Sequence, residues 1–138
     1  MTALVLDSSV TIAWFMPDEH SPAPQQVLER VAEDGAIIPT LWRLEVGNAL
    51  LFAVRRNRIS ADLRRAALTQ LAALPIAVDP DTHSHAWSET TALADRFRLT
   101  LYDACYLELA LRQRLPLASL DGDLRAAARA LDIPLLGA

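Results

Sequence analysis

Five short apolar runs, separated by helix-length segments, constrain the fold of this chain more than any other feature. They lie at residues 2–6, 36–39, 76–78, 116–120 and 134–136. Strands that are buried on both faces read as continuous apolar runs, because neither face has to be polar. Repeated alternation of such strands with helices indicates a parallel sheet with helices on both faces. The sequence therefore predicts an α/β fold, a three-layer sandwich around a five-stranded parallel sheet.

The segments between these runs have helical patterns. Ser8 or Ser9 stands at a capping position, Pro17 and Gly35 stand where helices should stop, and Ser60 caps another helix. A length of 138 residues is typical of one domain. We therefore expect a single domain over residues 1–138, with helices at about 9–16, 24–34, 41–57, 61–74, 81–97, 101–114 and 123–131.

Composition narrows the function classes. The net charge is −4 and all 13 basic residues are arginine, which argues against an indiscriminate nucleic-acid binder but allows a nuclease with a local arginine patch. The single Cys105 cannot form an internal disulfide, so a reducing cytosol is the simple interpretation. We see no signal peptide, and the charge-free run from 66 to 78 is too short to span a bilayer. We expect a soluble cytoplasmic protein.

Four acidic residues stand at the positions most informative for function. Asp7 and Asp121 directly follow predicted strands, where open parallel sheets bind ligands. Glu45 lies in an apolar helical stretch, and Asp103 opens another helix. Four carboxylates gathered in one pocket would repel one another without a cation. Oxygen-only ligands suit Mg²⁺ or Mn²⁺, so the sequence predicts a site for one of these ions.

Each acid also has a structural interpretation. Asp7 and Asp121 are favoured types of helix cap, although Asp123 could be the cap instead and leave Asp121 free. Thr100 and Asp103 have the spacing of a capping box.

The structural interpretation of Glu45 is an ion pair with Arg43 or Arg55, or simple exposure. Against it, Glu45 and Asn48 share one face of a helix that is apolar nearly all round, which predicts a polar spot in a buried helix.

Other residue types give weaker signals. One cysteine and two histidines that diverge on a helix argue against zinc, and we expect His20, His83 and His85 at the surface. The aromatic residues around 14–16, 42 and 52 indicate core or a subunit interface. An arginine cluster around the turn at 55–65 could clamp phosphate or simply be a solvated helix end: Arg55, Arg56, Arg58, Arg64 and Arg65.

Four segments in order resemble the PIN-domain ribonucleases, and specifically the VapC-like toxins of bacterial type II toxin–antitoxin pairs. They are Leu4-Val5-Leu6-Asp7-Ser8-Ser9, Trp42-Arg43-Leu44-Glu45-Val46-Gly47-Asn48-Ala49-Leu50, Leu101-Tyr102-Asp103-Ala104-Cys105-Tyr106-Leu107 and Leu117-Ala118-Ser119-Leu120-Asp121. The resemblance covers essentially the whole chain. Each segment is weak alone, whereas the ordered set is fairly specific.

The resemblance implies a Mg²⁺-dependent endoribonuclease toxin, a hydrolase that cleaves RNA phosphodiester bonds. Asp7 and Asp103 would hold the metal most directly, and Glu45 and Asp121 would complete the pocket or a second metal site. Ser8, Asn48 and Ser119 match supporting positions; the family often has Thr at the last of these, and both side chains offer a hydroxyl. Members are usually homodimers that a small antitoxin protein neutralises, and its tail covers the acidic pocket.

Alternatives from other classes remain. A housekeeping RNA-processing PIN nuclease would share the chemistry but not the toxin role, and a non-enzymatic binding domain could hold a structural acidic cluster. A phospho-acceptor signalling domain needs a lysine, which this chain lacks, and a haloacid-dehalogenase-like phosphatase needs Asp where Ser9 stands.

Overall fold

The central sheet is parallel throughout, with the strand order β3-β2-β1-β4-β5. The computed structural model describes residues 2–138. The middle strand β1 is completely buried, which explains why its sequence is an unbroken apolar run. The predicted α/β class and five-stranded parallel sheet are confirmed. The strands are β1 Leu4–Leu6, β2 Ala36–Ile38, β3 Ile76–Val78, β4 Leu117–Ala118 and β5 Leu135–Leu136.

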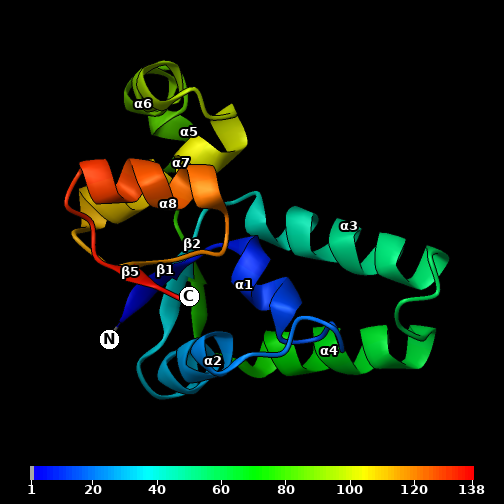
Figure 1. Ribbon diagram of the computed structural model, residues 1–138. Coiled ribbons are helices and arrows are strands. Elements are labelled where there is room, and N and C mark those ends of the chain that lie inside the picture. The colour runs from blue at the N-terminus through cyan, green and yellow to red at the C-terminus, as the bar shows by residue number, and fades with distance from the viewer. Residues whose placement is uncertain (1) are drawn as a thin grey trace.

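Helices flank this sheet on both sides (Figure 1). On one side α7 packs against β1 and β4, with α6 and α8 beside it; α2 and α4 lie on the other side. Within residues 2–138, no helix is long and apolar enough to cross a membrane. The helices are α1 Ser8–Ala13, α2 Pro22–Asp34, α3 Trp42–Arg55, α4 Ala61–Ala73, α5 Thr82–His85, α6 Glu89–Phe97, α7 Leu101–Gln113 and α8 Gly122–Ala130.

Helix α3 has one buried side and one exposed side, so the prediction that it is buried all round is wrong. Trp42, Val46 and Leu50 face the core, whereas Leu44 is 77% exposed. The reason is that α3 runs beside α4 as a helical pair that extends away from the sheet, with α1 packed against α3 (Figure 1). Apolar residues on the outer side of α3 therefore remain at the surface.

The helix predicted at about 81–97 is two helices, α5 and α6, with a turn between them. Ser88 has non-helical backbone angles (φ −120°, ψ −98°). The Thr91 hydroxyl donates to the Ala86 carbonyl at 2.7 Å, so a side chain satisfies a backbone group that a continuous helix would use. Ser and Thr side chains compete with the helical ladder in this way. Trp87 is 93% exposed on this turn.

Candidate active site

The site lies at the topological switch point of the sheet, on either side of which the chain adds strands in opposite directions. From β1 the chain adds β2 and β3 on one side and then β4 and β5 on the other. Leu6 at the end of β1 pairs with Ala118 at the end of β4, so the next residues, Asp7 and Ser119, are neighbours. Open parallel sheets bind ligands beyond the carboxyl ends of their strands at such a switch point.

Asp7 is held at this edge by two hydroxyl groups. It is only 4% exposed, and its Oδ2 accepts hydrogen bonds from Ser9 Oγ at 2.6 Å and Ser119 Oγ at 2.8 Å. Asp7 occupies the N-cap position of α1, yet its side chain makes no capping hydrogen bond. The capping interpretation of Asp7 is therefore wrong. Ser9 Oγ also accepts from the Leu120 amide at 2.9 Å, which ties the β4 loop to α1.

The capping interpretation of Asp121 is correct. Its Oδ1 accepts from the Leu124 amide at 3.0 Å at the start of α8, so Asp123 is not the cap. The Asp121 amide donates to Ser119 Oγ at 3.1 Å. Ser119 thus connects Asp121 to Asp7. A cap can still act electrostatically, and the charge of Asp121 helps to raise the pKa of Asp7.

Asp103 reaches the same edge from the first turn of α7. Thr100 caps this helix, because its Oγ1 accepts from the Asp103 amide at 3.1 Å, so the predicted cap is present. Burial is the largest cause that raises the pKa of the Asp103 carboxyl to about 6, followed by the charges of Asp121 and Asp7. Asp123 adds a smaller effect in the same direction.

Glu45 comes to this group from α3. It is half-buried, and the hydroxyl of Tyr106 on α7 donates to its Oε1, so its partner is not the Arg43 or Arg55 that sequence suggested. Burial raises the pKa of Glu45, the Tyr106 hydrogen bond opposes this, and the charges of Asp7 and Asp103 add to it.

The pKa of Asp7 is also raised, mainly by burial, although its bonds to Ser9 and Ser119 pull the other way. Three carboxyls from β1, α3 and α7 therefore have raised pKa values, and each senses the charge of at least one of the others or of Asp121. A cation would relieve this repulsion. The donor set, carboxylates with nearby hydroxyls, fits Mg²⁺ or Mn²⁺ in chemistry. Within residues 2–138, no three His, Cys, Asp or Glu side chains already converge as a complete metal site.

Sequence reasoning missed Ser9 and Tyr106, which hold Asp7 and Glu45. Tyr106 could have been found, because it follows Asp103 by three residues on the same face of α7 and a buried Tyr hydroxyl usually needs a partner. Of the predicted supporting residues, Ser119 contacts Asp7 directly, Ser8 is half-buried at the start of α1, and Asn48 is exposed one turn after Glu45.

Most of the arginine cluster has other contacts. Arg58 pairs with Asp18 and Glu19, and Arg65 pairs with Asp62. Arg55 and Arg56 lie over the ring of Phe52. Arg64 instead lines a hollow on α3 together with Arg43. As expected, His20 and His83 are exposed, whereas His85 is half-buried beside Glu89.

Comparison with known proteins identifies the family to which this chain belongs. The family model of the PIN domain matches residues 4–130. This chain belongs to the PIN domain family. PIN domains are generally nucleases that use divalent metal ions, and their substrates are nucleic acids. The edge of the sheet where Asp7 meets Ser119 is therefore the candidate nuclease site of a PIN domain.

One solved structure supports the fold independently. The crystal structure of PAE2754 from Pyrobaculum aerophilum is similar with a TM-score of 0.69 and 23% sequence identity, over 91% of this chain and 84% of that chain. At this identity the similarity concerns the fold. The search of curated proteins found no match.

Proposed function

We propose that this PIN domain, folded as one unit over residues 1–138, is a Mg²⁺-dependent endoribonuclease and the toxin of a toxin–antitoxin pair. One observation carries the nuclease proposal. A buried aspartate, Asp7, stands at the switch point of the sheet. Beyond the effect of burial, the charge of Asp121 helps to raise its pKa, the charges of Asp121 and Asp7 help to raise that of Asp103, and those of Asp7 and Asp103 help to raise that of Glu45. In a PIN domain, such a group is suited to bind the metal that the family generally uses.

Asp7 and Asp103 would hold Mg²⁺, or Mn²⁺ in its place, and Glu45 and Asp121 would complete the pocket. When bound, the ion supplies charge stabilisation on the phosphoryl oxygens and lowers the pKa of water. Ser9 and Ser119 fix Asp7 for this task, since both hydroxyls bind its Oδ2.

Glu45 and Asp121 can also orient the attacking water or accept its proton. Tyr106 binds Glu45 Oε1, which leaves Oε2 as the atom that takes a proton. The capping bond of Asp121 likewise uses Oδ1 and leaves Oδ2. We assign the orientation or deprotonation of water to one of these two carboxylates. Arginines beyond the pocket position the RNA through its phosphates.

Cleavage of RNA by the purified protein tests the nuclease proposal. We expect cleavage of total RNA with Mg²⁺ or Mn²⁺ that stops in EDTA, and sequencing of the new ends would identify the cleaved positions. Asp7→Asn and Asp103→Asn should abolish most activity, whereas the exposed Asp95→Asn on α6 should retain it. Full activity of a folded Asp103→Asn protein in EDTA would reject the proposal of a metal-dependent nuclease.

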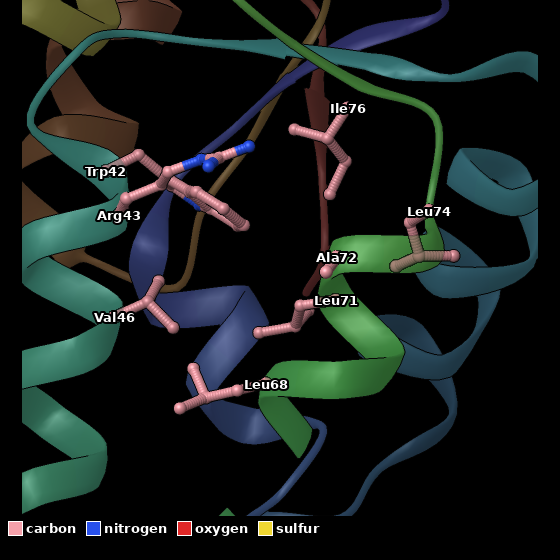
Figure 2. A pocket seen from close by; sticks show the side chains of 8 residues that line it. All are labelled: Trp42, Arg43, Val46, Leu68, Leu71, Ala72, Leu74 and Ile76. Atoms are coloured by element: carbon pink, nitrogen blue, oxygen red, sulfur yellow. The ribbon is translucent and has the colours of Figure 1, made fainter. Parts of the chain in front are cut away.

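The toxin part of the proposal rests on the VapC-like sequence segments and on two surfaces suited to an antitoxin. The acidic pocket attracts an Arg or Lys side chain as readily as a cation. Between α3 and α4 there is a mainly apolar cavity of about 190 Å³ (Figure 2). An apolar helix of the antitoxin fits such a groove. Its lining residues are Trp42, Arg43, Val46, Leu68, Leu71, Ala72, Leu74 and Ile76.

Growth experiments test the toxin role and separate it from a housekeeping nuclease. Expression of this chain alone should arrest its native host, and co-expression of the adjacent small gene should restore growth. Asp7→Ala should be harmless yet still bind the partner, because most of the proposed interface lies outside the metal site. The mass of the purified chain in solution tests the homodimer that this group usually forms. Normal growth and intact RNA with soluble wild-type protein would reject the toxin role.

A further inference from the structure

The candidate site continues along the exposed side of α3 as two adjoining hollows. The first, of about 420 Å³, is lined by Leu41, Leu44, Glu45, Asn48 and Tyr102. The second, of about 400 Å³, is lined by Arg43, Leu44, Gly47, Asn48, Leu51 and Arg64. The hollows share Leu44 and Asn48. A continuous strip therefore leads from a carboxylate of the site, Glu45, to two arginines.

Two large apolar side chains are exposed in this strip, each adjacent in sequence to an acid of the site. Tyr102, which is 66% exposed, directly precedes Asp103 on α7. Leu44, which is 77% exposed, directly precedes Glu45 on α3. Both line the same hollow as Glu45. The hollow that holds Glu45 therefore also offers a ring and an apolar side chain to a substrate.

We propose that Tyr102 and Leu44 form a binding site for one unpaired nucleobase next to the phosphodiester that is cut, and that Arg43 and Arg64 bind a phosphate farther along the same strand. This inference rests on the proposed nuclease function and adds the residues that hold the substrate.

The negative charge of the site is the reason that contacts to a base contribute to the affinity for RNA. The chain carries a net charge of −4, and without a bound cation the acids of the site repel phosphate. Arg43 and Arg64 line the second hollow and not the one that holds Glu45, so contacts to a base can supply affinity next to the acids. Every base has a face that stacks on an aromatic ring, but a duplex hides both faces within its own stack. The site therefore takes an unpaired strand and tolerates different bases.

Binding of a fluorescein-labelled, single-stranded 12-nucleotide RNA, followed by anisotropy in EDTA at low salt, tests this subsite without cleavage. Tyr102→Ala should weaken binding about 5- to 140-fold, the equivalent of about 1–3 kcal/mol for a stacked base. Tyr102→Phe keeps the ring and should stay within about twofold of wild type. Trp87→Ala removes an even more exposed ring from the turn between α5 and α6 and should change nothing.

An abasic position moved stepwise through the same RNA locates the stacked base. At one position it should weaken wild-type binding as much as Tyr102→Ala does, and the two changes together should cost no more than one. Arg43→Gln or Arg64→Gln should lower the dependence of binding on salt, whereas Tyr102→Ala should leave it unchanged.

The outcomes separate this inference from the nuclease proposal. Metal-dependent cleavage together with wild-type binding by Tyr102→Ala would overturn the nucleobase site alone. Neither binding nor cleavage of any RNA would overturn both. A Tyr102→Ala protein that changes from dimer to monomer on a sizing column would show that the exposed ring belongs to a subunit interface, which also overturns the inference.

Discussion

Replacing Asp103 with Asn should stabilise the metal-free protein at neutral pH, although the substitution removes a charge from a helix N-terminus. The folded pKa of Asp103 is raised from 3.8 to about 6, chiefly by burial and then by Asp121 and Asp7. The folded state therefore binds more protons than the unfolded state between about pH 4 and pH 6, and stability falls as pH rises through this range. Above this range the penalty is complete, and below it the penalty vanishes.

The size of the effect follows from the shift. At about 1.36 kcal/mol per pKa unit the full penalty is about 3 kcal/mol, and solvent screening of a half-exposed carboxyl reduces it to about 1–2 kcal/mol. Loss of the favourable interaction with the helix dipole opposes this by about 0.3–1 kcal/mol. The Thr100 cap remains, because it binds the backbone amide of residue 103. We expect a net gain of about 1 kcal/mol at pH 7.5.

Urea denaturation in EDTA measures this difference at pH 7.5 and pH 4. Asp103→Asn should be the more stable protein at pH 7.5 and should lose its advantage at pH 4. Asp95→Asn, an exposed acid on α6, is the matched control and should be neutral at both. An Asp103→Asn protein that is less stable than wild type at pH 7.5 would refute the reasoning and favour a purely structural role as part of the helix cap.

Two further substitutions test separate parts of the structure. Arg112 donates to Asp79 and Glu108, whose side chains are only 1% and 6% exposed, so Arg112→Met should cost about 3–5 kcal/mol in urea denaturation at pH 7. Burial raises the pKa of Asp79, but the hydrogen bonds from Arg112 and other groups hold it below 3.8. The stability lost in Arg112→Met should therefore shrink as the pH falls below 3.8. A loss under about 1 kcal/mol at pH 7 would contradict the pairing. Ser119→Ala removes a hydrogen bond that lowers the pKa of Asp7, so the acid limb of the pH profile of cleavage should move to higher pH, and Ser119→Thr should restore it. An unchanged profile would mean that Ser119 does not tune Asp7.

The sheet was predictable from the sequence because its central strands, β1 and β4, are buried. In a chain of this length, continuous apolar runs such as Leu4–Leu6 are typical of strands that are buried on both faces. Asp7 was predictable for the same reason, since a charged residue directly after a buried strand must lie at the edge of the sheet.

Tertiary packing determines the features of the structure that the sequence pattern did not predict. The apolar pattern of α3 predicted a buried helix, but α3 meets its neighbours on one side only, so Leu44 is exposed. Ser88 lies within a helical pattern, yet its non-helical backbone and the hydrogen bond from Thr91 to the Ala86 carbonyl interrupt the helix. The contacts of Ser9 and Tyr106 depend on how α1, α3 and α7 are placed, which local pattern does not specify.

Titration of the metal-free protein with Mn²⁺ in a calorimeter tests the central claim, that the four carboxylates form one cation site. At pH 6 about half of the Asp103 carboxyls carry a proton, so binding should release a fraction of a proton, measured in two buffers of different ionisation enthalpy. Asp7→Asn and Asp103→Asn should weaken binding at least about tenfold, and Asp103→Asn should also reduce this proton release. Absent binding, or equal binding by wild type and both variants, would contradict the claim.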